Sequence, residues 1–138
     1  MIKATSLIVS LVGLIVQGPG TPAARILGTW RGTSTCVDRQ TDRACSDEVV
    51  IYDVDSAAGP QGPVRMSADK VVNGVRQPMG LLRLQYDSTS HSWFADFTTR
   101  VHGRWSFEPH GEVMVGTLRE LPSARLVRRV TVRRSPPG

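Results

Sequence analysis

The sequence contains only two cysteines, Cys36 and Cys45, and it has no C-x-x-C pair. A zinc or redox site usually needs such a pair or clustered histidines, and His91, His102 and His110 form no H-x-H or H-x-x-x-H pair. No G-x-S-x-G motif is present, and no glycine-rich loop leads into a helix where it would hold a phosphate. We therefore expect no metal, no cofactor and no catalytic residues, and we interpret the histidines as exposed residues in or near turns.

Carboxylates offer the only other candidates for chemistry, with Asp47 and Glu48 before one apolar segment and Asp53 and Asp55 at its end. Paired carboxylates can share a proton or bind a cation. Their ordinary role in a β-protein is a polar border to a strand, and nothing else in the sequence converges on them. We expect a protein that is not an enzyme, with a hydrolase or isomerase as the third alternative.

A long apolar run is also missing, because the run from Leu7 to Val16 is well short of the roughly 20 residues that span a bilayer. Lys3 precedes this run, and glycines, prolines and alanines follow it, which is the pattern of a secretory signal peptide. We assign residues 1–24 to the signal, with cleavage between Gly18 and Ala24, and residues 25–138 to one domain. No cysteine follows the run to accept a lipid, so we expect a protein without a membrane span, exported to the periplasm or the extracellular space.

Export places the two cysteines in a compartment where disulfides persist. We therefore predict a Cys36–Cys45 disulfide. Closing so short a loop contributes about 2–3 kcal/mol in the chain-entropy model.

Positive charge is concentrated near the end of the chain, although the whole protein carries a formal net charge of only +5. The arginines of this cluster are Arg119, Arg125, Arg128, Arg129, Arg133 and Arg134. Such a cluster could attract nucleic acid, anionic lipid headgroups or lipopolysaccharide. No aromatic residue interleaves with it, so we expect no nucleic-acid partner and favour a solvated face of an edge or closing strand.

The mature part of the chain shows alternating apolar and polar residues with frequent turn signals, and no segment has the period of a helix. The expected strands are Ile26–Cys36, Glu48–Val54, Val64–Val72, Leu81–Tyr86, Trp93–Thr99, Val101–Glu108, Glu112–Arg119 and Arg125–Arg134. Their connections are too short for the crossovers that parallel strands need. We predict an all-β fold, a single antiparallel up-and-down β-barrel of about eight strands, with an open two-sheet β-sandwich as the alternative.

Two connections carry specific signals. Asn73-Gly74 favours a type I′ hairpin turn, in which both central residues need positive φ. We expect Pro78 and Gly80 to interrupt the strand that returns from this turn. The segment Gly59–Pro63 predicts a stiff loop at a barrel mouth.

The start Gly28-Thr29-Trp30 resembles the first strand of lipocalins and related calycin barrels. The longer stretch Gly28–Cys36 is also similar to the start of short secreted bacterial proteins with no assigned activity. The resemblance implies that Trp30 plugs one barrel end and that a basic residue of the last strand packs over its indole ring. Alternation along that strand favours Arg128 for this role, with Arg134 as the second choice.

Inward-facing side chains of such a barrel either fill the interior or line a pocket. The candidates for pocket lining are Tyr52, Leu82, Leu84, Tyr86, Trp93, Phe97, Trp105 and Phe107. We expect a monomeric, lipocalin-like binding module for a small apolar or amphipathic ligand. The alternative is a protein-binding barrel, such as an inhibitor of a secreted protease that acts through an N-terminal trunk.

Overall fold

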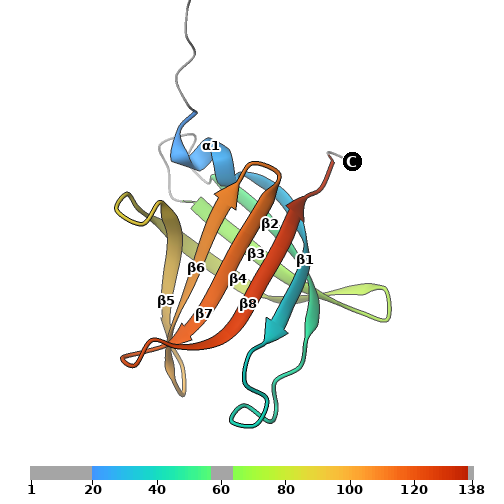
Figure 1. The fold of residues 1–138 in the computed structure, drawn as a ribbon. Coiled ribbons are helices and arrows are strands. Elements are labelled where there is room, and N and C mark those ends of the chain that lie inside the picture. The colour runs from blue at the N-terminus through green and yellow to red at the C-terminus, as the bar shows by residue number, and fades with distance from the viewer. Residues whose placement is uncertain (1–19, 57–63, 137–138) are drawn as a thin grey trace, which may run out of the picture.

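The computed structural model describes residues 20–56 and 64–136, and these form one closed barrel in which each strand pairs with the next and β8 pairs with β1 (Figure 1). The elements are α1 (Pro22–Ile26), β1 (Gly28–Cys36), β2 (Glu48–Ser56), β3 (Val64–Val72), β4 (Val75–Asp87), β5 (Ser92–Thr98), β6 (His102–His110), β7 (Val113–Glu120) and β8 (Arg125–Arg134). All eight pairings are antiparallel. The predicted up-and-down barrel is confirmed, and the two-sheet sandwich is wrong. The greater part of the predicted signal and the loop Gly59–Pro63 lie outside the described residues.

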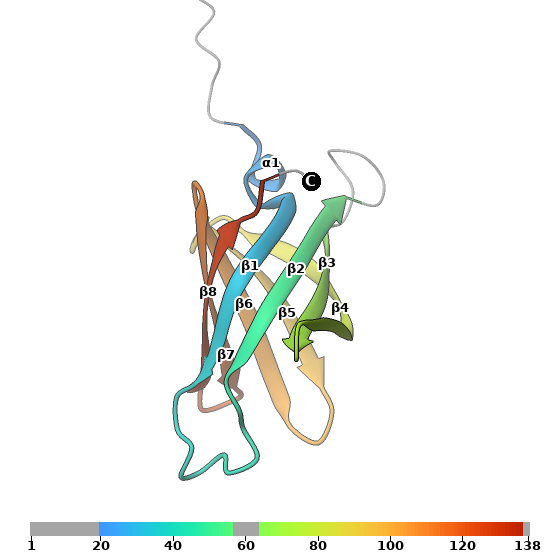
Figure 2. The ribbon, with the colours of Figure 1, turned by 90° about the vertical axis from the view of Figure 1, so that its right-hand side faces the viewer.

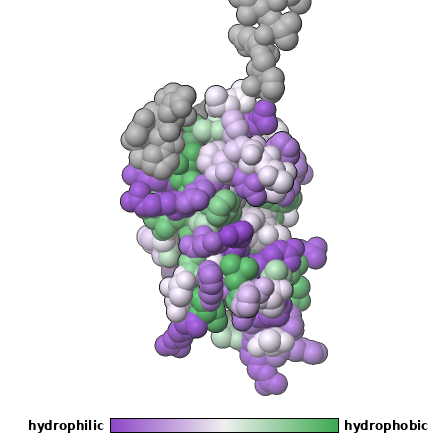
Figure 3. Space-filling model, turned by 90° about the vertical axis from the view of Figure 1, so that its left-hand side faces the viewer, coloured by the Kyte–Doolittle hydropathy of each residue, from purple (hydrophilic) through white to green (hydrophobic). Residues whose placement is uncertain are grey.

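The strands form because their apolar residues recur at every second position, which places them on one face of a pleated strand. In β2 the residues Val50, Tyr52 and Val54 are all buried, and β8 contributes Val130 and Val132 in the same way. These side chains meet in the barrel interior and form its core. Outside, polar side chains alternate with small apolar ones, and the face shown in Figure 3 carries no continuous hydrophobic patch.

A short helix, α1, precedes the first strand, where we had expected the strand to begin at Ile26. The Thr21 hydroxyl accepts a hydrogen bond from the Ala24 N–H and caps the helix. Ile26 has no exposed surface and belongs to the core. The helix α1 is a single turn, so its sequence shows no helical period. It is stabilised by burial of the Ile26 side chain across one end of the barrel.

Trp30 is fully buried below α1, and its indole N–H donates to the Ile26 carbonyl oxygen at 2.9 Å. The basic residue over its ring is Arg134, whose guanidinium carbon lies 4.3 Å from the ring centroid. The prediction of Arg128 for this position is therefore wrong. In the antiparallel β1–β8 pair, Trp30 lies opposite Arg134, whereas Arg128 lies opposite Cys36, about 20 Å away along the strand.

The β3–β4 hairpin extends away from the barrel wall (Figure 1). Its turn has φ of 52° at Asn73 and 78° at Gly74, which confirms the type I′ prediction. The predicted interruption at Pro78 and Gly80 is wrong, because β4 continues through both and the register shifts opposite Ala68 and Asp69. A β-bulge accommodates the extra residue without ending the strand.

One seam of the barrel is much shorter than the others. β4 pairs with β5 only where Gln85–Asp87 lie opposite Ser92–Phe94. Among the described residues, the preceding part of β4, residues 75–84, therefore has one edge without a neighbouring strand, and Val75, Met79 and Leu81 there are exposed.

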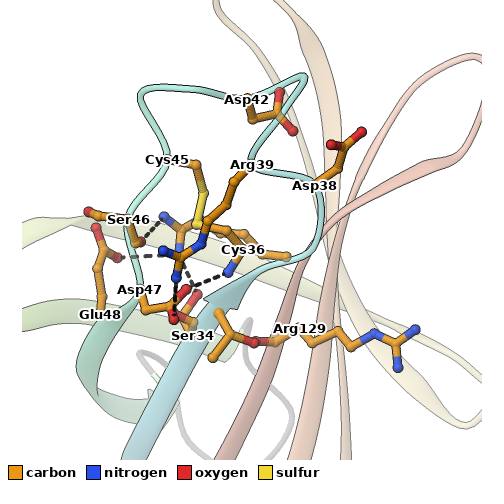
Figure 4. The surroundings of a disulfide bond; sticks show 12 residues. Ser34, Cys36, Asp38, Arg39, Asp42, Cys45, Ser46, Asp47, Glu48 and Arg129 are labelled. Carbon is orange, nitrogen blue, oxygen red and sulfur yellow. Dashed lines mark hydrogen bonds and ion pairs between the residues drawn. A yellow bond between two sulfur atoms is a disulfide. The ribbon is translucent and has the colours of Figure 1, made fainter.

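The predicted Cys36–Cys45 disulfide is confirmed (Figure 4). It closes the loop between β1 and β2, which lies at the barrel end opposite α1 (Figure 2). Asp47 beside it accepts a hydrogen bond from the Cys36 N–H at 2.9 Å and forms an ion pair with Arg39. The Cys36 hydrogen bond and the Arg39 charge lower the pKa of Asp47 against a smaller opposing effect of desolvation. The loop is thus held by a covalent bond and a side-chain bridge.

Candidate ligand-binding site

A cavity of about 340 Å³ lies in the barrel toward the disulfide loop. It is lined by Ser34, Glu48, Tyr52, Ala68, Met79, Gly80, Leu81, Leu82, Trp105, Phe107 and Arg128. Its volume is at the lower end of the range of small-molecule pockets, about 300–1,000 Å³. The lining divides into an apolar wall and a polar end.

Aromatic rings build much of the apolar wall. Trp105 and Phe107 stack with their centroids 5.9 Å apart, and Tyr52 meets Phe107 edge to face at 5.6 Å. Gly116 on the neighbouring strand makes room for Phe107, because a Cβ atom there would lie 2.8 Å from the Phe107 ring. Leu82 of β4 is among the apolar residues that complete the lining. The rings are fixed by packing and offer flat apolar surface to a ligand.

Arg128 provides the polar end of the cavity. Its guanidinium donates to the Ser34 hydroxyl at 3.0 Å and to the Ser46 carbonyl oxygen at 2.7 Å, and it lies 3.8 Å from a Glu48 carboxylate oxygen. Only 13% of its side chain is exposed. In Figure 4 Ser34, Ser46 and Glu48 lie beside the disulfide, so the loop holds the partners of this arginine in place. Among the described residues its Nε has no hydrogen-bond partner.

Tyr52 completes the polar end from β2. The residue is 3% exposed, and its hydroxyl has no hydrogen-bond partner among the described residues, although it is not sealed from the cavity. Burial raises the pKa of this phenol, and the nearby Glu48 charge raises it further while Arg128 lowers it. The hydroxyl is therefore neutral at physiological pH and can donate to or accept from a ligand. Because the hydroxyl opens to the cavity and no described residue bonds to it, it is available to a ligand.

Four of the eight residues predicted to line a pocket, Tyr52, Leu82, Trp105 and Phe107, line this cavity. The prediction is wrong for Leu84, which is buried in the core outside the lining. The remaining three, Tyr86, Trp93 and Phe97, do not line this cavity. These three lie in other hollows of the barrel surface, because the strand tilt distributes one inward face over the whole length of the barrel.

The paired carboxylates do not act as pairs. Asp53 accepts from the Thr29 hydroxyl at 2.8 Å and from Arg76 at 2.6 Å, and Asp55 pairs with Arg65. Burial raises the pKa of Asp53, but the contacts with Thr29 and Arg76 outweigh it and the net shift is downward. These carboxylates are polar strand borders with cationic partners.

His91, His102 and His110 are exposed, as predicted. Within residues 20–56 and 64–136 no group of three histidine, cysteine or acidic side chains could hold a metal ion. The described part of the chain also contains no helix that is long and apolar enough to cross a membrane. No protein-family model matches the sequence, and a search of curated proteins finds no match.

Proposed function

We propose that this protein is an exported, lipocalin-like, non-enzymatic binding module that holds one small amphipathic molecule in the cavity. The observation that carries the proposal is a cavity in which the Tyr52 hydroxyl, open to the cavity and without a hydrogen-bond partner among the described residues, and the Arg128 guanidinium face an aromatic and aliphatic wall. A ligand polar group would bind Tyr52 and Arg128. Its apolar part would lie against Trp105, Phe107 and Leu82.

The division of the cavity supports an amphipathic ligand over a purely apolar one. Arg128 is largely buried, and the carboxylate with which it pairs, Glu48, is 3.8 Å away, which is too long for a hydrogen bond. A negatively polarised ligand atom would add a charge-assisted hydrogen bond at this point. The disulfide and the apolar segment Leu7–Val16 support export, because disulfides persist outside the cytosol.

The test is native mass spectrometry on protein purified from its own secretion route, compared with the same sample after denaturation. We expect a bound molecule that leaves on denaturation. Tyr52→Phe and Arg128→Gln should reduce its occupancy, whereas Arg129→Gln, which removes the neighbouring outward-facing charge, should not. Leu82→Trp should displace the molecule by filling the cavity.

A bare mass for the wild-type protein, or equal occupancy in Tyr52→Phe, Arg128→Gln and Leu82→Trp, would contradict a ligand at this site. The second candidate would then come first, namely a protein-binding barrel. The observation that favours it is the edge of β4 over residues 75–84, which has no neighbouring strand in the described part of the chain and could pair with an extended segment of a partner. Titration with secreted proteases, followed by residual protease activity, separates an inhibitor from a carrier.

A further inference from the structure

Closure of the barrel brings together three arginines that are distant in sequence. β1 pairs with β8 so that Arg31 lies directly opposite Arg133, and Arg129 lies opposite Thr35. All three arginines are exposed, while their strand neighbours Trp30, Val130 and Val132 are buried inside. We call Arg31, Arg129 and Arg133 the β1–β8 basic face. Figure 2 shows β8, β1 and β2 side by side on this part of the barrel.

These arginines have no evident role in stabilising the fold. None of the three has an acidic partner among the described residues, whereas Arg125 and Arg134 of the same strand both do. Like charges directly opposite each other, as in Arg31 and Arg133, destabilise a sheet. Protection of a free strand edge is no explanation either, because at Arg133 and Arg129 the strand β8 is paired on both sides.

Nearby acids are already engaged. On the strand next to Arg31, Asp53 binds Arg76 at 2.6 Å, and Glu112 at the β6–β7 turn lies 3.9 Å from Arg134. In Figure 4 the Arg129 side chain points away from the carboxylates around the disulfide loop. The basic face is therefore an uncompensated region of positive charge.

An uncharged row crosses the face between Arg129 and Arg133. It runs over four adjacent strands through Val115, Thr131, Thr33 and Val49, which follow one another in the strand registers. Val115 and Val49 are each 39% exposed. Strand spacing makes the row about 14 Å long, and Arg129 and Arg133 are about 13 Å apart along β8. The two threonines thus lie between the arginines, and the two exposed valines flank them on β7 and β2.

We propose that the β1–β8 basic face docks the protein on an anionic lipid bilayer surface. Guanidinium groups bind lipid phosphates with two hydrogen bonds, and the exposed valines that flank them reach the less polar zone below the headgroups. The face contains no aromatic side chain for stacking nucleic-acid bases, which favours lipid as the source of the anionic groups. Each arginine near such a surface raises the affinity about five-fold, so three contribute roughly 100-fold.

The experiment is vesicle sedimentation of the mature protein at low salt, with phosphatidylcholine alone and with added phosphatidylglycerol. We compare wild type with the triple variant Arg31→Gln/Arg129→Gln/Arg133→Gln. The matched control is Arg43→Gln/Arg83→Gln/Arg100→Gln, which removes three exposed arginines elsewhere and gives the same net charge. The expected results are binding only to anionic vesicles, release by salt, roughly 100-fold loss in the face variant and a much smaller loss in the control.

Equal losses in the two triple variants would overturn the proposal, because net charge alone would then explain the affinity. Absence of wild-type binding at low salt would overturn it too, as would tighter binding to single-stranded DNA than to the anionic vesicles. Urea unfolding of both variants shows whether they are folded. We expect the face variant to be at least as stable as wild type, because it removes the Arg31–Arg133 repulsion.

Discussion

Replacing Arg134 tests how the closed end of the barrel is held together. Its guanidinium donates to the carbonyl oxygens of Arg25 and Leu27 in and after α1, and it stacks over Trp30. A hydrogen bond from a charged group contributes about 1.5–3 kcal/mol, and a partly exposed cation–π contact about 0.5–1 kcal/mol. Because 26% of the side chain is exposed, the lower values apply. Arg134→Gln should therefore lower the free energy of unfolding by about 3 kcal/mol.

The assay is urea unfolding followed by tryptophan fluorescence, together with a thermal scan in which the Tm should fall by about 10 °C. Arg133→Gln is the control, because it removes the same charge from the preceding position. The Arg133 side chain is exposed and has no acidic partner among the described residues. We expect this control to change stability by no more than about 0.5 kcal/mol. Equal losses in the two variants would refute the idea that Arg134 fastens α1 to Trp30.

Three further predictions concern the disulfide, the N-terminus and acid. The double variant Cys36→Ser/Cys45→Ser should unfold at lower urea, with a loss of about 2–3 kcal/mol, whereas an unchanged midpoint would mean that the loop is held without the bond. A chain beginning at Arg25 loses the Thr21 cap and should be about 1–2 kcal/mol less stable to urea than one beginning at residue 19, and equal midpoints would contradict this role of the cap. Hydrogen bonds from Arg104 lower the pKa of Asp96 in the folded state. The ion pair therefore stabilises the protein above the unfolded pKa near 3.9, and this stabilisation is lost as pH falls through the lower folded pKa. Stability should therefore decline below about pH 4, and less steeply in Asp96→Asn, and parallel acid limbs in wild type and variant would contradict this assignment.

Most of the fold follows from sequence because its signals are local. Alternation of apolar residues marks each strand, short connections force antiparallel pairing, and Asn73-Gly74 specifies its turn. The disulfide follows from having only Cys36 and Cys45 in the mature part. The helix before β1 could not be predicted, because one turn has no period and depends on the barrel end that buries Ile26.

The site depends on register, which a single strand does not reveal. Alternation correctly places Arg128 inside the barrel, but the same pattern holds for Arg134 six residues later. The antiparallel pairing rule carries enough information to choose between them, since the end of the last strand must meet the start of the first, where Trp30 lies. Ser34 and Glu48 were missed for another reason, because small polar residues at strand ends give no signal of a cavity.

Because the β4–β5 seam is short, the barrel should resist opening less there than at its other seams. Opening a sheet requires breaking its cross-strand hydrogen bonds, and here Gln85–Asp87 carry all of the pairing on one side of β4. Met79 and Leu82, on the same strand, belong to the cavity wall. Widening the cavity at this seam therefore needs only a hinge, whereas at the other seams the hydrogen bonds along a whole strand would have to break. For the binding function proposed above, the size of the ligand would thus depend on how easily one strand bends.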